Sequence, residues 1–183
     1  MFLKKKKNAA SAGPTPSGKR SLHISRVFDA PKEELFDIFT QGEHMKNWWG
    51  PRGYEMTIIS QELKPGGFIH YKQQSPEGNI IWGKFVYKEI ESPDKLVYAN
   101  SFADETGRTV RAFFSKDWPL EIMNTVTFEE QEGGRTKITL NGLPEDAKKA
   151  EMRVFETLRE SLKQGFSDTF DLLEEYLAQR KEQ

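Results

Sequence analysis

Three residues in the middle of the chain, His70, Arg111 and Glu121, carry side chains that could do chemistry inside an apolar cavity. A single charged or titratable group in such a cavity orients a ligand, or takes on a shifted pKa that suits acid–base catalysis. Nothing in the sequence places the three groups together. Each is therefore a candidate for orienting a ligand, and cyclisation, dehydration or hydrolysis using one of them is the alternative. For His70 a position on the surface or at a strand edge is a further alternative.

Composition and spacing disfavour most familiar catalytic sites. The chain has no cysteine, which excludes disulfides, thiolate zinc sites and cysteine nucleophiles. Its three histidines lack metal-ligand spacing such as His-Glu-x-x-His, and there is no Gly-x-Ser-x-Gly elbow, P-loop or dinucleotide glycine pattern. We therefore expect no metal, no cofactor and no catalytic residue, and a binding protein rather than an enzyme.

Large aromatic side chains form the second group of candidates. Aromatic residues make up 12% of the chain, with 13 Phe and 4 Trp, and such rings supply large apolar contact areas. Any one ring is equally explained by a packed core, but as a set they predict a cavity that encloses a hydrophobic or aromatic small molecule. The candidate cavity residues, besides the three polar ones, are Trp48, Trp49, Trp82, Phe102, Phe114, Trp118, Phe166 and Phe170.

The size and charge of the chain restrict the classes of protein to which it can belong. With 183 residues and 21.1 kDa, it fits one domain of ordinary size plus a tail. The formal net charge of −1 hides an asymmetry, because residues 1–20 carry six basic side chains and no acidic one. The remainder has 21 basic and 28 acidic side chains, a net charge of −7. An acidic body argues against a nucleic-acid-binding surface, which needs clustered Lys and Arg.

The first twenty residues read as a flexible basic tail, and residues 21–180 as a single folded domain. Residues 9–18 have too little apolar surface to offset the entropy of ordering. Small polar residues follow Lys4 to Lys7 where a signal peptide would have an apolar region, and no run approaches the roughly 18 apolar residues of a membrane span. We expect a cytoplasmic protein with no stable membrane insertion and at most weak contact of the tail with an anionic membrane.

The periodicity of the domain predicts a strand, two helices, a meander and a long helix. Residues 22–28 alternate as a strand, Pro31 begins a helix, and a second short helix over 43–49 ends at Gly50 and Pro51. Short extended runs divided by turn residues follow from Tyr54 to Gly142, which is typical of an antiparallel meander. Counting the first strand, we expect six or seven strands.

Two segments of the domain stand out. Residues 103–119 read as a long loop, or as a loop with a short strand over 110–113, and a loop of this length is often placed over a binding site. Residues 145–178 read as one helix, because apolar residues recur every three or four positions from Phe155 to Leu177. Gly165 lies midway along that helix, where a close approach of backbone or ligand, or a kink, would explain it.

Several short motifs occur in a specific order. They are Asp29-Ala30-Pro31, Trp48-Trp49-Gly50-Pro51, Gly66-Gly67-Phe68, Gly83, Glu91 to Val97, and Gly165-Phe166 with Leu173 and Tyr176-Leu177. This set, spread over 22–177, resembles the START-like (SRPBCC) helix-grip superfamily, in its branch related to the activator of the Hsp90 ATPase, the AHSA1-like domains. Phe166 stands where that branch usually has Trp, a departure that could alter the shape of the cavity.

The resemblance implies an α+β helix-grip fold, in which a curved antiparallel sheet of six or seven strands wraps around a long C-terminal helix, with two short helices after the first strand. It also implies a cavity between the sheet and that helix. Domains of this kind serve many functions, so the fold does not decide among them. The leading hypothesis is non-catalytic binding of an apolar small molecule. The alternatives are a protein-interaction domain, such as one that modulates a chaperone ATPase, and a cavity enzyme.

Overall fold

A computed structural model describes residues 20–182. The tail expected over 1–20 therefore lies outside the described residues, apart from Arg20. The elements follow one another as β1 (Leu22–Phe28), α1 (Lys32–Thr40), α2 (Gly42–Met45), β2 (Glu55–Gln61), β3 (Phe68–Gln74), β4 (Ile80–Glu91), β5 (Lys95–Phe102), β6 (Ile122–Gln131), β7 (Arg135–Pro144) and α3 (Lys149–Lys181). The predicted fold class, an α+β helix-grip fold, is confirmed, and the sheet has seven strands.

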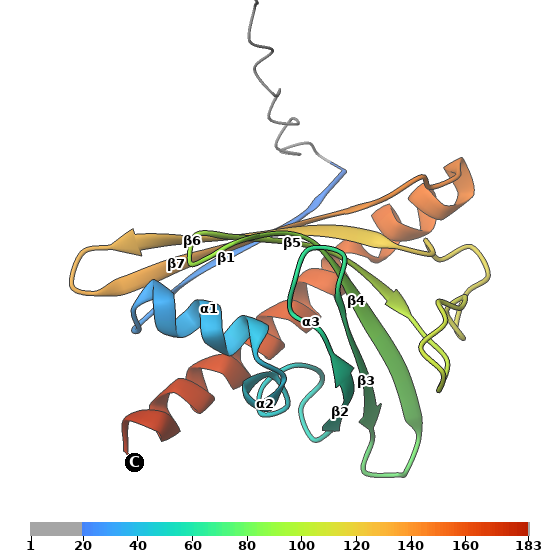
Figure 1. The fold of residues 1–183 in the computed structure, drawn as a ribbon. Coiled ribbons are helices and arrows are strands. Elements are labelled where there is room, and N and C mark those ends of the chain that lie inside the picture. Colours follow the sequence, from blue (N-terminus) through green and yellow to red (C-terminus); the bar gives the residue numbers. More distant parts are fainter. Residues whose placement is uncertain (1–19, 183) are drawn as a thin grey trace, which may run out of the picture.

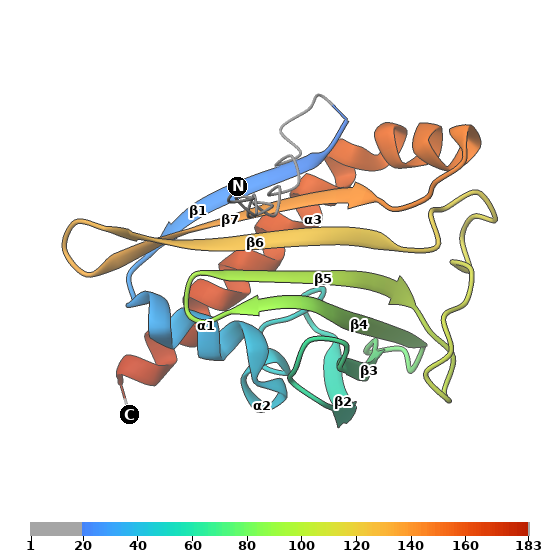
Figure 2. The same ribbon diagram turned by 45° about the horizontal axis from the view of Figure 1, so that its top comes forward.

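The sheet is antiparallel throughout, in the order β1-β7-β6-β5-β4-β3-β2. It curls around α3, which crosses the concave face, while α1 and α2 lie on the same side (Figures 1 and 2). Register shifts at Ile58/Ser60 in β2 and at Tyr87/Glu89 in β4 mark irregularities of the ladder. Such bulges bend a strand and increase its twist, which helps to turn the β2–β4 part of the sheet around the helix.

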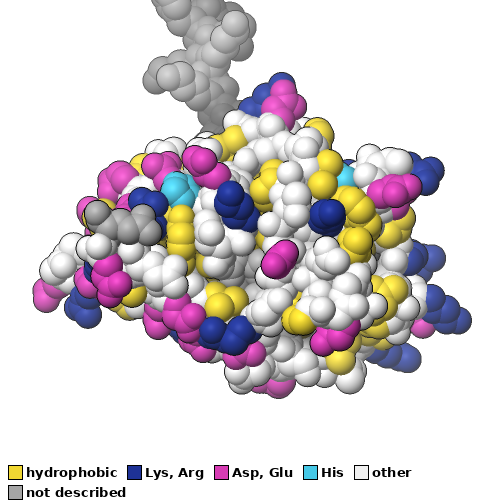
Figure 3. Space-filling view, turned by 90° about the horizontal axis from the view of Figure 1, so that it is seen from below, with side chains coloured by type: hydrophobic (Ala, Val, Ile, Leu, Met, Phe, Trp, Pro, Cys, Tyr) yellow, Lys and Arg dark blue, Asp and Glu magenta, His cyan; other side chains and the backbone are white. Residues whose placement is uncertain are grey.

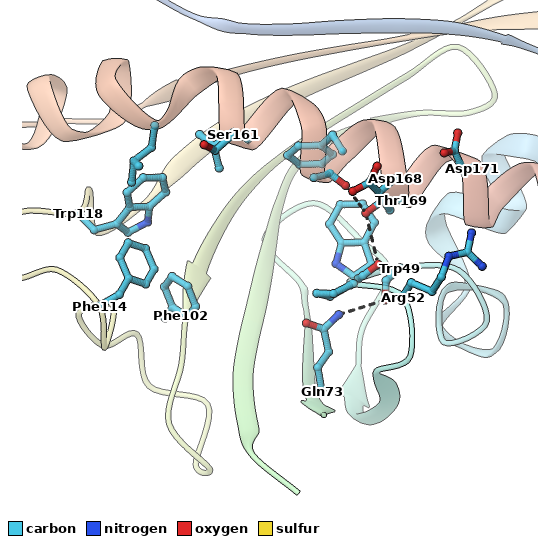
Figure 4. A pocket seen from close by; sticks show the side chains of 16 residues that line it. Trp49, Arg52, Gln73, Phe102, Phe114, Trp118, Ser161, Asp168, Thr169 and Asp171 are labelled. Atoms are coloured by element: carbon cyan, nitrogen blue, oxygen red, sulfur yellow. Dashed lines mark hydrogen bonds between the residues drawn. The ribbon is translucent and has the colours of Figure 1, made fainter. Parts of the chain in front are cut away.

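The core lies between the concave face and the apolar stripe of α3. Phe155, Phe170 and Leu173 of that helix are fully buried, and the ring of Phe170 meets Phe28 of β1 edge-on at 5.3 Å. Phe39 of α1 packs in the same way against Phe128 of β6, at 5.4 Å. These contacts hold the helix across the sheet. They leave the middle of α3, on the side of β3 to β5, for the cavity described below (Figure 4).

Two predicted helix boundaries need correction. The second helix is shorter than predicted, ending at Met45 with turns up to Trp48. The last helix starts at Lys149, because β7 runs on to Pro144 and residues 145–148 turn the chain. No strand forms within the β5–β6 loop (residues 103–121), apart from one isolated bridge between Ala103 and Thr109.

The first part of the β5–β6 loop is a tight turn organised by Asp104. Its carboxylate accepts hydrogen bonds from the backbone N–H groups of Thr106 and Arg108, at 2.9 and 3.1 Å, and from the Arg108 Nε at 2.9 Å. The hydroxyl of Thr106 also donates to it, at 2.7 Å. These donors hold the pKa of Asp104 well below its usual range. The loop therefore has a defined shape over 103–109.

The start of α3 is fixed by Glu151, which joins it to the β5–β6 loop. Glu151 accepts hydrogen bonds from the backbone N–H of Lys148, at 2.8 Å, and from Arg111. The backbone N–H and then the guanidinium lower the pKa of the Glu151 carboxyl. A pKa lowered by folding stabilises the fold above the unfolded value, and this stabilisation is lost as the pH falls through the folded value.

We expect Glu151→Gln to lower the free energy of unfolding at pH 7 by about 1 kcal/mol, the size of one hydrogen bond. The difference from the unmodified protein should narrow as the pH falls through the lowered pKa of Glu151, because its carboxyl then becomes protonated and loses its charge as well. Urea denaturation over a range of pH measures both effects. Glu156→Gln, at an exposed position on the same helix, is the control. A deficit that stays constant down to pH 2 would contradict this assignment.

Candidate ligand-binding cavity

A cavity of about 630 Å³ lies between α3, the segment after α2, the end of β5 and the β5–β6 loop (Figure 4). Its sixteen lining residues come from all of these elements and from β3. They are Trp49, Gly50, Pro51, Arg52, Gln73, Phe102, Phe114, Trp118, Leu158, Ser161, Leu162, Gly165, Phe166, Asp168, Thr169 and Asp171. Most are apolar, and the charged ones gather at the Trp49 end (Figure 4).

Aromatic rings form both ends of the cavity. At one end Trp49 meets Phe166 of α3 edge-on at 5.9 Å, and Phe85 of β4 at 5.2 Å. At the other end Phe114 of the β5–β6 loop contacts Phe102 at 5.8 Å and Trp118 at 5.4 Å. Edge-to-face contacts of this kind hold rings in fixed orientations. The cavity thus has two aromatic walls, with the middle of α3 as its roof in Figure 4.

The two adjacent tryptophans have different environments. Trp48 is 1% exposed, its indole N–H donates to the carbonyl of Ile38 at 3.3 Å, and its ring lies 4.7 Å from that of Phe39. Trp49 is half-buried and faces the cavity. Burial raises the pKa of Tyr71 to about 12, and a hydrogen bond with Trp49 partly opposes that rise. Trp48 therefore belongs to the core and Trp49 to the cavity wall.

Gly50 lets the chain turn at the edge of the cavity. It has φ of 118°, and a Cβ at this position would lie 2.1 Å from the Nε2 of Gln73. That Nε2 donates to the carbonyl of Trp49 at 3.0 Å, and the Thr169 hydroxyl lies 3.4 Å from the carbonyl of Gly50. This turn therefore links β3 and α3 through main-chain carbonyls.

We expect Gly50→Ala to lower the free energy of unfolding by roughly 2–4 kcal/mol. A backbone conformation restricted to glycine costs about 1–3 kcal/mol for other residues, and the displaced Gln73 loses a hydrogen bond that contributes about 1 kcal/mol. Chemical denaturation provides the measurement. A change below about 0.5 kcal/mol, the usual range for surface substitutions, would show that the turn tolerates a side chain.

The charged groups at the Trp49 end are mostly paired. Arg52 donates two hydrogen bonds to the carboxylate of Glu175, at 3.1 and 2.7 Å. This pairing raises the pKa of Arg52 and lowers that of Glu175. Asp171 is paired with Arg26 of β1 at 2.5 Å. Asp168 accepts a hydrogen bond from the Gln164 amide at 2.8 Å and has no ion pair within the described part of the chain.

Five of the predicted cavity residues line this cavity: Trp49, Phe102, Phe114, Trp118 and Phe166. Two others, Trp48 and Phe170, lie in the core, and the remaining four lie elsewhere. Arg52, Gln73 and Asp168 also line the cavity and were not among the residues predicted from the sequence. The helix positions Leu158, Leu162, Gly165 and Thr169 recur every three or four residues, and that spacing was a usable signal.

His70 and Trp82 lie on the face of the sheet away from α3. In β3, Ile69 and Tyr71 are buried in the core, so His70 between them points to the opposite face. There its ring stacks on Trp82 at 5.4 Å, and its Nε2 lies 3.0 Å from the carbonyl of Asp104. The turn at 103–109 covers His70, which is 3% exposed although it lies outside the concave core.

Arg111 and Glu121 also lie outside the cavity. Arg111 is exposed, and its guanidinium donates to Glu151 and, at 3.1 Å, to the carbonyl of Trp118. It therefore ties the β5–β6 loop to the start of α3. Glu121 directly precedes β6, where Ile122 faces inward, so Glu121 points the other way. The structure does not bring Arg111, Glu121 and His70 together.

Among residues 20–182, no group of three His, Asp or Glu side chains is placed to hold a metal ion. Within the same residues, no helix is long and apolar enough to cross a membrane.

Comparisons with known proteins agree with this architecture. The model of the family described as "Activator of Hsp90 ATPase homolog 1-like protein" matches residues 29–178. A solution structure from Staphylococcus epidermidis is 25% identical, covers 98% of this chain and 95% of that chain, and has a TM-score of 0.69. One from Arthrobacter aurescens is 24% identical, with coverages of 88% and 87% and a TM-score of 0.73.

A crystal structure of a protein from Mycobacterium smegmatis is 24% identical, with coverages of 87% and 91% and a TM-score of 0.70. These likenesses show the fold. No curated protein matches the sequence.

Proposed function

The chain belongs to the family of Activator of Hsp90 ATPase homolog 1-like proteins, and we propose that it binds a hydrophobic or aromatic small molecule in the cavity between its sheet and α3. Membership of this family and the fold give a ligand-binding or interaction domain in general. The class of ligand, a hydrophobic or aromatic small molecule, is what we propose beyond this.

The observation that carries the proposal is the cavity itself. Its volume of about 630 Å³ falls in the range of roughly 300–1,000 Å³ that is usual for small-molecule sites. Rings of Trp49 and Phe166 form one end, and Phe102, Phe114 and Trp118 form the other. An apolar ligand between them would remove both aromatic walls from water.

The β5–β6 loop supplies one of these walls and is anchored at two positions that precede Phe114. Before the wall, the turn at 103–109 packs on the outer face of the sheet, where the Lys84 ammonium donates to the carbonyl of Gly107 at 3.0 Å. Arg111 then joins the loop to α3 through Glu151. A lid formed by residues 112–118 would move beyond these anchors, with Phe114 and Trp118 as the parts that meet the ligand.

The proposal is tested by thermal unfolding with a library of lipids and aromatic compounds, together with native mass spectrometry of the freshly purified protein. A ligand at 100 times its Kd should stabilise the fold by about 2.7 kcal/mol and raise the Tm by roughly 5–10 °C. No shift across the library, together with a native mass equal to the denatured mass, would overturn the proposal.

A second candidate function is the modulation of a chaperone ATPase, and one observation favours it beyond the family's description. Phe113 is 77% exposed and Phe114 is 50% exposed, and their ring centroids lie 5.4 Å apart on the β5–β6 loop. The face in Figure 3 intersperses hydrophobic with charged side chains. Exposed apolar side chains that cluster often mark a contact site. Titration into an Hsp90 ATPase assay should change the rate, and Phe113→Ser should weaken that effect; an unchanged rate would remove this candidate.

A further inference from the structure

We propose that the ligand carries a hydrogen-bond donor with positive charge, such as a protonated amine, at its Trp49 end. This inference rests on the proposed function, because it names the polar group of the molecule that the cavity would hold. It follows from three features of that end of the cavity: an amide oxygen without a donor, a carboxylate without an ion pair, and a cation that is already neutralised.

The first feature is the side-chain carbonyl of Gln73. This residue is 8% exposed and lines the cavity from β3. Its Nε2 is used by the carbonyl of Trp49, whereas its Oε1 accepts no hydrogen bond within residues 20–182. In Figure 4 this oxygen points away from Trp49, toward the middle of the cavity. Among residues 20–182, this oxygen is not one of the side-chain atoms that are both buried and unpartnered, so it is open to the space of the cavity. A ligand that filled this space without a donor would leave the oxygen buried and unpaired, whereas a ligand with a donor would satisfy it.

The second feature is the carboxylate of Asp168. It lies on α3, next to Thr169 and one turn after Gly165, and it lines the cavity. The Gln164 amide is its hydrogen-bond donor, and no cationic side chain of the described residues pairs with it. Arg52 interacts electrostatically with Asp168 but is hydrogen-bonded to Glu175, so the negative charge of Asp168 is largely left for a ligand. A cation here would also lie beside the rings of Trp49 and Phe166, which attract positive charge to their faces.

The third feature is that Arg52 offers little to an anionic ligand. Both of its terminal nitrogens donate to Glu175, in the two-bond geometry that guanidinium and carboxylate groups prefer. A ligand carboxylate would have to displace Glu175 and would also lie near Asp168 and Asp171. The geometry therefore favours a donor over an acceptor, and a cation over an anion.

The test uses three probes on one ring system: naphthylethylamine, naphthylethanol and naphthylpropionate, each titrated calorimetrically into the full chain at pH 7. The amine should bind about tenfold more tightly than the alcohol, since one hydrogen bond to a charged group contributes on that scale. The carboxylate should bind most weakly. The ratio of amine to alcohol affinity is the quantity to compare among variants, because a general loss of protein stability weakens the binding of both probes alike.

Asp168→Asn should reduce that ratio about threefold, the effect of an exposed charge pair. Gln73→Leu should also reduce it about threefold, because the amine donates a charge-assisted hydrogen bond to this residue where the alcohol donates a neutral one. Glu160→Gln, an exposed carboxylate on α3 outside the cavity, should leave the ratio unchanged. Equal affinities of amine and alcohol, or a preference for the amine that survives both substitutions, would overturn the inference while the proposed function stands. Failure of all three probes to bind would also overturn the inference, whereas the library screen and the native mass decide the proposed function.

Discussion

Gly165→Leu will bind hydrophobic ligands roughly 10- to 100-fold more weakly than the unmodified protein, while its free energy of unfolding stays equal or rises. A Cβ at this position meets no atom within 4 Å, and Gly165 lines the cavity. A leucine side chain therefore extends into the space of the ligand. Steric overlap between this side chain and the ligand costs about 1–3 kcal/mol of binding free energy, which corresponds to an affinity roughly 10- to 100-fold weaker. The helix itself gains, because glycine within a helix costs about 1 kcal/mol.

Two matched substitutions separate these effects. Gly165→Ala adds a single methyl group and should raise the free energy of unfolding by about 1 kcal/mol with a much smaller effect on binding. Glu160→Leu places the same leucine at an exposed position of α3 outside the cavity, and should leave binding unchanged. Ligand titration and urea denaturation supply both measurements. Full-strength binding by Gly165→Leu would show that the ligand lies elsewhere.

Trp48→Ala will lower the free energy of unfolding by about 3–5 kcal/mol, whereas Trp49→Ala will cost less stability and will mainly weaken ligand binding. Trp48 is 1% exposed, and removal of a buried ring loses its transfer free energy and leaves a void. The carbonyl of Ile38 also loses the indole donor, which lies 3.3 Å away. Trp49 is half-buried against Phe85 and Phe166, and its other surface belongs to the cavity.

Chemical denaturation and ligand titration of both variants test this contrast between neighbouring residues. Trp48→Phe is the control for the indole donor, because it keeps most of the ring volume while removing the hydrogen bond to Ile38. It should lose about 1 kcal/mol rather than the full amount. Equal losses of stability in Trp48→Ala and Trp49→Ala would contradict the division between core and cavity wall.

The order of the elements could be predicted from the sequence, because periodicity and turn residues act locally. The stripe from Phe155 to Leu177 predicted a long helix with one buried face, and α3 buries Phe155, Phe170 and Leu173. The direction of each side chain in the turns after α2 could not be predicted, since no regular period applies there. This is why Trp48 and Trp49 were grouped as cavity residues although their environments differ.

The strand residues show a different limit. Side chains alternate along a strand, so placing one residue inward fixes its neighbours, but a shift of one position reverses them all. In β3 the residues that face the core do not stand out by burial, because Ile69, His70 and Tyr71 are all buried. His70 is buried by the turn at 103–109 on the outer face of the sheet. Gln73 shares the inward face with Tyr71, and a polar residue there gave no signal as a cavity residue.

The four tryptophan indole N–H signals in a two-dimensional ¹H–¹⁵N NMR spectrum provide the most direct test of the cavity as the ligand site. Trp49 and Trp118 line the cavity, whereas Trp82 stacks on His70 on the outer face of the sheet. With a ligand that raises the Tm, we predict saturable shifts of the Trp49 and Trp118 signals while the Trp82 signal stays in place. A shift of the Trp82 signal with the other two unmoved would contradict the assignment of the cavity as the binding site.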